Sequence, residues 1–441
     1  MTPPKPEPRA DKVSLWGHLR AFRRDILSAQ PARLYRAWMA EFRTPFFESY
    51  LCNDPALVRR VLDERPADFP KSRRVTEGLL PLLGRSVFVT NGEEWLRQRR
   101  IIDPAFEGGR AKEAFPAIWA ACEAAVARMA VGEVEVELAA SHAAADVIFR
   151  TLFSIPIEDR VAQAVFHAFR AYQRSAPILN LGAFVPLPAW VPRLHRRAAL
   201  RSARAIRRLI EGLTAERAAA VAAGLAPPDL ATKIMTTPDP VTGVPFATVE
   251  MVDQVAIFFL AGHETSASAL AWALYLLATH PEAQARVAAE AAGLRPEFGV
   301  VGSLRFTRDV FREALRLYPP VPMLVRETTM PEEFRGRMVK PGAQVVISPW
   351  HLHRHERLWD RPDDFDPDRW AGEVPQGGYL PFSRGPRVCP GAGFAMLEGT
   401  LLLAHLVRAF RFEALPGRVP VPVAHLTVRA KDGIWLRVTR R

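Results

Sequence analysis

The sequence contains few cysteines and no long uninterrupted apolar run. Its three cysteines among 441 residues, Cys52, Cys122 and Cys389, are too few and too scattered for a disulfide framework, and they favour a reducing compartment. No stretch approaches the ~20 apolar residues of a membrane span, and residues 1–9 are rich in proline and charge, unlike a signal peptide. We therefore expect a cytoplasmic protein without a membrane anchor.

The sequence also lacks a low-complexity linker and an internal repeat. A chain of this length with 49% hydrophobic residues can enclose a cofactor. We expect one compact, monomeric unit, in which an N-terminal segment and first strand, residues 1–53, join a main domain, residues 54–441. The formal net charge of +12 is dispersed and no nucleic-acid-binding motif accompanies it, so it favours an acidic protein or acidic lipid over nucleic acid.

The spacing of apolar residues predicts a mainly α protein with small β-sheets. The helical period is found over residues 111–130, 159–174, 193–222 and 248–279. Strand-like segments are short, at residues 46–51, 343–348, 426–429 and 434–438. Asp432-Gly433, between the last two segments, predicts a hairpin.

Cys389 lies in a loop shaped by glycines and prolines. Open N–H donors and the charge of Arg387 would stabilise a thiolate there, although a lone cysteine in a turn is more often a small buried hydrophobe. The spacing F-x-x-G-x-R-x-C-x-G resembles the haem-binding loop of the cytochrome P450 superfamily. It is formed by Phe382, Gly385, Arg387, Cys389 and Gly391.

This resemblance implies the P450 fold, a triangular helical prism around a buried haem b. Cys389 would bind the iron, Phe382 would pack near the sulfur, Arg387 would face a haem propionate and Gly391 would open the next helix. A thiolate ligand favours O–O bond cleavage. The similarity spans about residues 54–438 and is greatest to soluble bacterial hydroxylases of fatty acids, carotenoids or terpenoids.

A second motif, Ala261-Gly-His-Glu-Thr-Ser266, places polar residues in an apolar helix. Unpaired burial of the Glu264 and Thr265 side chains would cost ~1–3 kcal/mol or more each, so we expect them to bond to each other, to backbone or to water. A helix bend with Thr265 bonded to the previous turn is the alternative. The segment resembles the oxygen-activation motif A-G-x-E-T of P450 monooxygenases. It implies that Thr265 orients a water or hydroperoxide, that Glu264 relays protons, and that Gly262 leaves room for dioxygen; His263 is assigned no role.

Two further elements resemble structural parts of the same family. Glu313 and Arg316, three residues apart, match its E-x-x-R helix, and Arg369 matches the later arginine that completes a buried triad. The resemblance implies a role in folding and haem retention, because buried networks matter most when every member is satisfied. An ordinary surface pair is the alternative.

Basic and aromatic residues are candidates for haem propionate contacts. Trp95 and Arg99 are one helical turn apart and resemble the family's W-x-x-x-R helix, with an amphipathic basic helix as the alternative. Arg326 matches a further contact, with a solvated loop arginine as the alternative. His351, His353 and His355 alternate without acidic or cysteine partners, so we expect solvated residues rather than metal ligands.

The stretches that line the family's substrate pocket are apolar here, which implies an apolar substrate such as a fatty acid, terpenoid or carotenoid. The candidates are Val87, Phe88, Phe258, Phe259, Ala261, Val321, Leu324 and Leu426. Residues 175–192 contain four prolines and predict a semi-rigid lid. The lid either packs inward or makes a peripheral membrane contact through Leu181, Phe184, Leu187 and Trp190, with Arg193, Arg196 and Arg197 at acidic head groups.

The motifs together predict a haem-thiolate monooxygenase that inserts one oxygen atom from dioxygen into an apolar substrate. The chain carries no flavin, nicotinamide or iron–sulfur segment. We therefore expect electrons to come from NAD(P)H through a separate acidic donor, such as a ferredoxin with its reductase. A peroxygenase or hydroperoxide isomerase on the same haem is the first alternative, and a non-enzymatic haem sensor the second.

Overall fold

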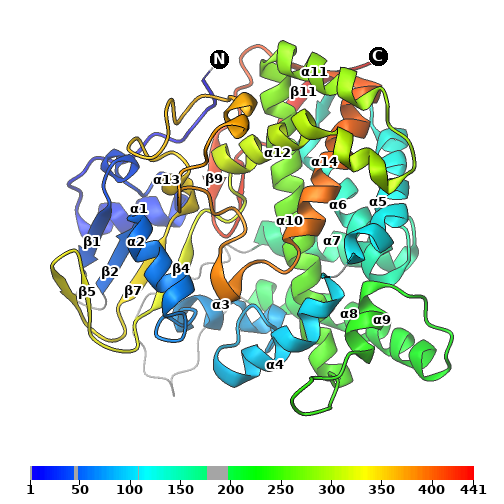
Figure 1. Cartoon of the computed structure of the whole chain (residues 1–441), viewed down its shortest axis with the longest axis horizontal. Helices are drawn as coiled ribbons and strands as arrows, with labels where there is room; N and C mark the ends of the chain where they lie inside the picture. The colour runs from blue at the N-terminus through cyan, green and yellow to red at the C-terminus, as the bar shows by residue number, and fades with distance from the viewer. Residues whose placement is uncertain (1, 44–47, 108, 176–196) are drawn as a thin grey trace.

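The structure is a computed structural model that describes residues 2–43, 48–107, 109–175 and 197–441 (Figure 1). The proposed lid and its flanking arginines, residues 175–197, lie almost entirely outside these ranges. The α-helices of the described residues are α1 (Leu15–Arg24), α2 (Pro55–Arg59), α3 (Arg73–Leu83), α4 (Gly92–Ile102), α5 (Arg110–Arg128), α6 (Val136–Phe153), α7 (Arg160–Ser175), α8 (Arg197–Ala222), α9 (Leu230–Thr236), α10 (Thr248–Thr279), α11 (Pro281–Ala291), α12 (Arg305–Leu317), α13 (Pro349–Leu352) and α14 (Ala392–Ala409).

The strands are short and form small sheets beside the helices. They are β1 (Met39–Arg43), β2 (Glu48–Cys52), β3 (Gly132–Glu135), β4 (Leu324–Glu327), β5 (Glu332–Phe334), β6 (Arg337–Val339), β7 (Gln344–Ile347), β8 (Phe410–Ala414), β9 (Pro422–Ala424), β10 (Val428–Ala430) and β11 (Trp435–Arg440). The predicted mainly α class with small sheets is therefore confirmed, as are the four helical segments.

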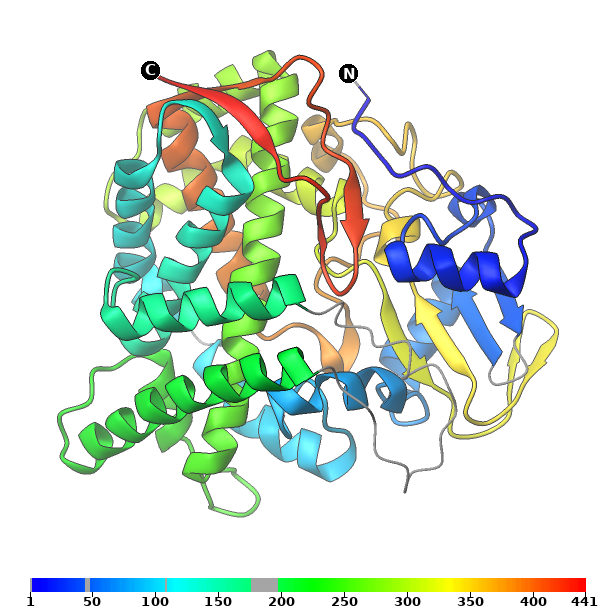
Figure 2. The ribbon, with the colours of Figure 1, turned by 180° about the vertical axis from the view of Figure 1, so that it is seen from behind.

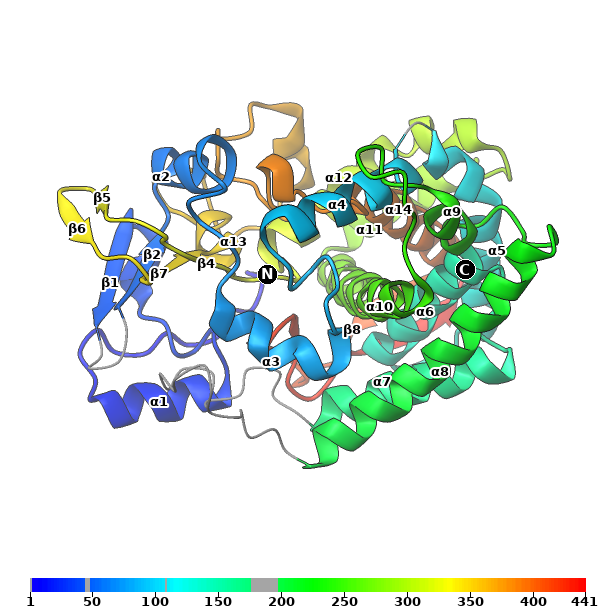
Figure 3. The same ribbon diagram turned by 90° about the horizontal axis from the view of Figure 1, so that it is seen from below.

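Helix α10 runs through the middle of the helical part of the molecule, and Figure 3 shows it nearly end-on with α6, α7 and α8 around it. It is apolar on most sides, as is typical of a helix buried all round. The Glu250 carboxylate accepts the Ala247 N–H at 2.8 Å, which satisfies a free donor at the helix start. Pro281 opens α11 immediately afterwards and cannot continue α10, because proline lacks an N–H and clashes with the preceding turn. The observed bounds match the predicted ones.

Helices α6, α12 and α14 pack against α10, and α5 packs against α6 and α14, to form the main core. Trp272 of α10 stacks on Tyr318, just after α12, with ring centroids 3.9 Å apart. Helix α14 is long and apolar enough to span a membrane by length and composition, but 67% of its apolar window is buried inside the protein. It is thus accounted for as a core helix, and it begins immediately after the cysteine loop.

A separate four-stranded sheet, in the order β1-β2-β7-β4, lies to one side of the helices (Figure 1). Strand β2 pairs antiparallel with β1 and parallel with β7, and β7 pairs antiparallel with β4. Tyr50, Val345 and Ile347 are fully buried on this sheet. The sheet fixes β4, and β4 carries Arg326 toward the site.

The hairpin predicted at Asp432-Gly433 is wrong. The turn exists, with Gly433 at φ +74°, but β10 pairs with β9, and β11 pairs with β3 and β8. Leu436 and Val438 of β11 are buried in the helical core. That non-local burial draws β11 into a different sheet, which a local turn signal cannot reveal.

Candidate active site

The loop that carries Cys389 is closed by backbone contacts. Gly385 has φ +69°, and a Cβ there would lie 2.1 Å from the Leu62 carbonyl oxygen, so only glycine fits. The Cys389 N–H donates to the Phe382 carbonyl oxygen at 2.9 Å. Gly391 is the N-cap of α14. The side chain of Cys389 is therefore held at the positive end of a helix dipole, which favours a negative charge on sulfur.

Cys389 is exposed, unlike the other two cysteines, which are buried. Burial raises the pKa of Cys389, and the Gly391 N–H and the Arg99 charge act in the opposite direction. Because burial is the largest of these effects, a bound cation must supply most of the charge that would ionise this thiol.

Three cations pack against the ring of Trp95. The distances to the ring centroid are 5.5 Å for Lys71, 5.9 Å for Arg99 and 5.0 Å for Arg387. Trp95 and Arg99 share one face of α4, as predicted, while Arg387 comes from the cysteine loop. Arg99 also donates to the Val388 carbonyl oxygen at 2.7 Å, which ties α4 directly to that loop.

Lys71 and Arg326 are buried beside these groups. The Lys71 ammonium donates to backbone carbonyls, and its pKa is lowered well below the usual value, first by burial and then by Arg326, Arg387 and Arg99. Arg326 in β4 is buried, and burial together with Arg387 lowers its pKa to about 10. The alternative of a solvated loop arginine is therefore wrong. Lys71 was not anticipated, because no motif in the sequence marks it.

Lys71, Arg99, Arg326 and Arg387 form a cationic cluster with unused donors. The Nε atoms of Arg326 and Arg387 are buried without a hydrogen-bond partner among the described residues. Buried cations of this kind require a nearby anion. The two propionates of haem supply such charge, so the residues fit haem. The cationic cluster and Trp95 would hold the propionates, and Cys389 would bind the iron.

One face of α10 is directed toward the cysteine side of the molecule. Ala261 is exposed although most of α10 is buried. One turn earlier, the Phe258 ring packs against the Phe106 ring, with centroids 5.9 Å apart. Phe106 in turn packs against Phe394 of α14, with centroids 5.5 Å apart. The Thr265 hydroxyl donates to the Ala261 carbonyl oxygen at 2.5 Å. Thr265 thus bonds to the previous turn, as the helix-bend alternative requires.

Glu264 faces a different side of α10 from Thr265. Its Oε1 accepts the Thr427 hydroxyl at 2.5 Å. Burial raises the pKa of Glu264, with Thr427, Arg429 and Gln173 acting in the opposite direction. Among the described residues, Glu264 thus binds a hydroxyl from a distant loop, not Thr265 or backbone as expected.

Two residues of α10 pack closely against α6. A Cβ on Gly262 would lie 2.3 Å from Cδ1 of Ile148, so glycine permits this close approach. Phe259 is buried and packs on Phe149, with ring centroids 4.5 Å apart. Room for dioxygen at Gly262 and a place for Phe259 in the substrate pocket stay predictions.

The remaining pocket candidates all keep some exposed surface, and Phe88 is 38% exposed. They are Val87, Phe88, Phe258, Ala261, Val321, Leu324 and Leu426. The loop before α4 is held by α10, since the Arg85 N–H donates to Asp253 at 2.8 Å and the Val87 N–H donates to Gln254 at 2.9 Å. Helix α10 therefore positions the loop that carries Val87 and Phe88.

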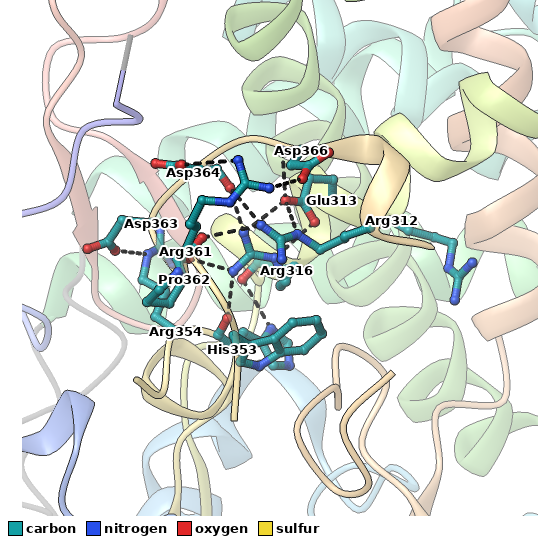
Figure 4. Close-up of polar contacts among 12 residues, drawn as sticks. Arg312, Glu313, Arg316, His353, Arg354, Arg361, Pro362, Asp363, Asp364 and Asp366 are labelled. Atoms are coloured by element: carbon teal, nitrogen blue, oxygen red, sulfur yellow. Dashed lines mark hydrogen bonds and ion pairs between the residues drawn. The ribbon is translucent and has the colours of Figure 1, made fainter. Parts of the chain in front are cut away.

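Glu313 and Arg316 lie in a buried network (Figure 4), to which Arg369 also belongs. Arg316 donates twice to Glu313, at 2.8 and 2.9 Å, and Arg369 donates to the same carboxylate at 2.9 Å. Arg316 also donates to the carbonyl oxygens of His353, Pro362 and Asp364. Glu313 and Arg316 are fully buried, so this is not an ordinary surface pair.

The expectation that His351, His353 and His355 are solvated is wrong, because all three are buried. His353 Nδ1 lies 3.2 Å from the Arg316 carbonyl oxygen, and its Nε2 accepts the Leu380 N–H at 2.8 Å. A neutral imidazole can donate at one nitrogen and accept at the other. His353 therefore connects the Glu313 network to the segment that leads into the cysteine loop.

Glu398 on α14 is a buried carboxyl that sequence reasoning missed. Burial raises its pKa to about 8, against a hydrogen bond from Ser266 of α10. The Glu398 side chain is therefore mostly protonated near neutral pH. Its partner Ser266 directly follows Thr265 in the sequence. A single glutamate in an otherwise apolar helix is the sequence feature that could have predicted this buried carboxyl.

Comparison with known proteins agrees with this site. The family profile described as Cytochrome P450 matches residues 37–436. Cyclooctatin synthase of Streptomyces melanosporofaciens is 34% identical over 395 residues, 86% of this chain and 84% of that protein. Cyclooctat-9-en-7-ol 5-monooxygenase of the same organism is 34% identical over 419 residues, 92% and 89% of the two chains. The 11-oxo-beta-amyrin 30-oxidase of Glycyrrhiza uralensis is 28% identical over 410 residues, 87% of this chain and 77% of that protein. With a cysteine loop and a cationic cluster that fit haem, the chain belongs to the cytochrome P450 family and is a haem-dependent monooxygenase.

Proposed function

We propose that the protein hydroxylates a polycyclic terpenoid-type substrate at the site between Cys389 and the Ala261–Thr265 face of α10. The arrangement of the cysteine loop with the cationic cluster carries this proposal. The partly exposed pocket candidates are apolar, which suits a hydrocarbon skeleton. The names of two relatives, a cyclooctat-9-en-7-ol 5-monooxygenase and an 11-oxo-beta-amyrin 30-oxidase, support a terpenoid over a fatty acid.

Cys389, Thr265, Glu264 and the cationic cluster would each have a separate role in the reaction. Bound haem supplies the activation of dioxygen, with Cys389 as its iron ligand. Thr265 would orient a water by hydrogen bonding, since its hydroxyl lies on the face with Ala261. Glu264 would hold a proton, because its raised pKa increases the protonated fraction near neutral pH. The cationic cluster would keep the haem in position.

The oxygen source and the electron source test the function. With NAD(P)H, a ferredoxin and its reductase under ¹⁸O₂, we expect one labelled oxygen in the product of a terpenoid substrate found by a substrate-induced spectral shift. Product formed from peroxide alone, with no dependence on reductant, would instead identify a peroxygenase. Spectral shifts with fatty acids and none with terpenoids would reject the substrate class.

Thr265→Ala should leave substrate binding nearly unchanged but divert reducing equivalents into hydrogen peroxide. A positioned proton donor contributes ~10²–10⁴-fold, so we expect the ratio of product to nicotinamide consumed to fall about tenfold or more. Thr279→Ala is the matched control, because Thr279 makes the same bond to the preceding turn of α10, to Tyr275 at 3.1 Å. Equal coupling in the two variants would remove Thr265 from the mechanism.

The electron donor is proposed to be an acidic ferredoxin that docks near the cysteine loop, in keeping with the net charge of +12. Salt screens the steering between exposed charges. The second-order rate of reduction should therefore fall steadily from low to moderate ionic strength in stopped-flow measurements. A rate that does not change with salt would contradict electrostatic docking.

A further inference from the structure

A cavity of about 940 Å³ lies on the side of α10 where Glu264 points. Its walls come from α6, α7, α10 and the β9–β10 hairpin, with residues 5–7 of the N-terminal segment at one edge. Figure 2 shows this hairpin, in red, lying along α10 beside the N-terminal segment. Exposed charged residues, including Lys5, Glu7 and Asp432, line part of it. The cavity therefore connects Glu264 with solvent.

Two carboxyls in this cavity are bound by the same short stretch of chain. Thr427 donates its hydroxyl to Glu264, and the backbone of Ala430 donates to Glu137 of α6. Thr427 and Ala430 are on the order of 10 Å apart along an extended strand. The side chain of Arg429, between them, interacts electrostatically with both carboxyls. Glu137 and Glu264 therefore line the same cavity and are both bound by the stretch from Thr427 to Ala430.

Polar groups line the cavity between the two carboxyls. Ser141 lies one turn after Glu137 on α6, and its hydroxyl is 2.7 Å from Nε2 of His263, the residue before Glu264. Gln173 of α7 also lines the cavity, and its side chain hydrogen-bonds to the Glu264 carboxyl. A polar cavity of this size has room for ordered water between its polar side chains. The motif position left without a role, His263, thereby becomes part of the cavity wall.

We propose that Glu137 is a proton-relay residue that passes protons from solvent through this cavity to Glu264. One proton moves from the Glu137 carboxyl through water to Glu264 Oε2, and solvent at the cavity mouth returns a proton to the Glu137 carboxylate. Glu137 acts through Glu264 and touches neither substrate nor haem. The proposal rests on the proposed function, because a monooxygenase consumes protons at this site.

The charges around Glu137 are consistent with this role. Burial raises the pKa of Glu137 to about 7, Glu135 adds to the rise, and Arg429 and Arg170 oppose it. The carboxyl is thus half protonated near neutral pH, which suits a group that must both take up and release a proton. His263 is largely neutral there, because burial, Arg170 and His142 lower its pKa to about 4.

The holoenzyme variant Glu137→Gln tests the relay. In wild type, coupled turnover should fall as the pH rises through about 7, because the protonated fraction of Glu137 falls. In Glu137→Gln we expect kcat to fall roughly threefold to tenfold, with KM nearly unchanged and this inflection lost. Glu137→Asp should restore part of the rate and the inflection. Glu7→Gln is the matched control, since Glu7 is an exposed acid in the same cavity.

Infrared difference spectra give a readout that does not depend on turnover. Glu398, with its pKa of about 8, contributes a carboxylic acid band in every variant. A second carboxylic acid band, which titrates near pH 7, should be present in wild type and in Glu7→Gln, and absent in Glu137→Gln. A wild-type kcat and pH profile in Glu137→Gln would overturn the relay, as would survival of this second infrared band after the substitution. Failure of the proposed function is distinct from both, since wild type itself would then form no oxygenated product.

Discussion

Cys389→Ser should abolish the strongly red-shifted band of the ferrous carbon monoxide complex, and monooxygenation with it. A neutral hydroxyl cannot replace the electron donation of a thiolate to haem iron. The loop itself should survive, because its closing contacts use the Gly385 backbone and the Cys389 N–H rather than the sulfur. Reduced carbon monoxide difference spectra and product assays check both expectations.

The other cysteines serve as controls for that experiment. Cys52 and Cys122 are fully buried, and burial raises the pKa of Cys52 to about 12 and that of Cys122 well above its usual value. Both are therefore thiols packed in apolar surroundings, and Cys52→Ala and Cys122→Ala should keep the band. Loss of the band in either variant, with retention in Cys389→Ser, would show that the ligand is misassigned.

Glu313→Gln should lower the free energy of unfolding by about 3–5 kcal/mol, because it leaves the buried Arg316 charge without its anion. This is a large fraction of the ~5–15 kcal/mol that stabilises a typical protein. Arg369 would lose its carboxylate partner as well, since it donates to the same oxygen as Arg316. The midpoint of denaturant unfolding and the haem content of the purified holoenzyme both report the change.

Asp368→Asn is the matched control for Glu313→Gln. Asp368 pairs with Arg286 at 2.7 Å, but the two side chains are 64% and 52% exposed. Exposed pairs contribute about 0–1 kcal/mol, so the unfolding midpoint should hardly move. A similar loss in the two variants would mean that the Glu313 network has no special role in stability.

The sequence carried enough information to predict the long central helix. Residues 248–279 are apolar on nearly every side, so the helical period is unbroken, and Pro281 marks the end. The cysteine loop was also predictable, because its glycines and prolines are local requirements of the backbone. Glu313, Arg316 and Arg369 could be grouped only through the family resemblance, since nothing local links residues more than fifty positions apart.

Side-chain surroundings were harder to predict than helices. His351, His353 and His355 alternate without acidic or cysteine partners, which suggested a solvated loop. All three are buried instead, and ring nitrogens of His351 and His353 form hydrogen bonds in the core. Phe258 and Phe259 are adjacent and equally apolar, yet Phe259 is buried and Phe258 keeps some exposed surface. Lys71 became part of the site only because β4 brings Arg326 beside it. Such cases depend on tertiary contacts that one sequence does not specify.

Thr265 and Glu264 face different sides of α10, and of the two only Glu264 lines the cavity that reaches solvent. An apolar molecule that fills the space beside Ala261 does not have to share its route with water that reaches Glu264 beside Thr427. A bulky substrate would then displace water from the space beside Ala261, while water still reaches Glu264 through the cavity. Substitutions at Phe258 or Ala261 should accordingly alter which molecule is oxidised. Substitutions at Thr427 or Arg429 should instead alter the ratio of product formed to nicotinamide consumed.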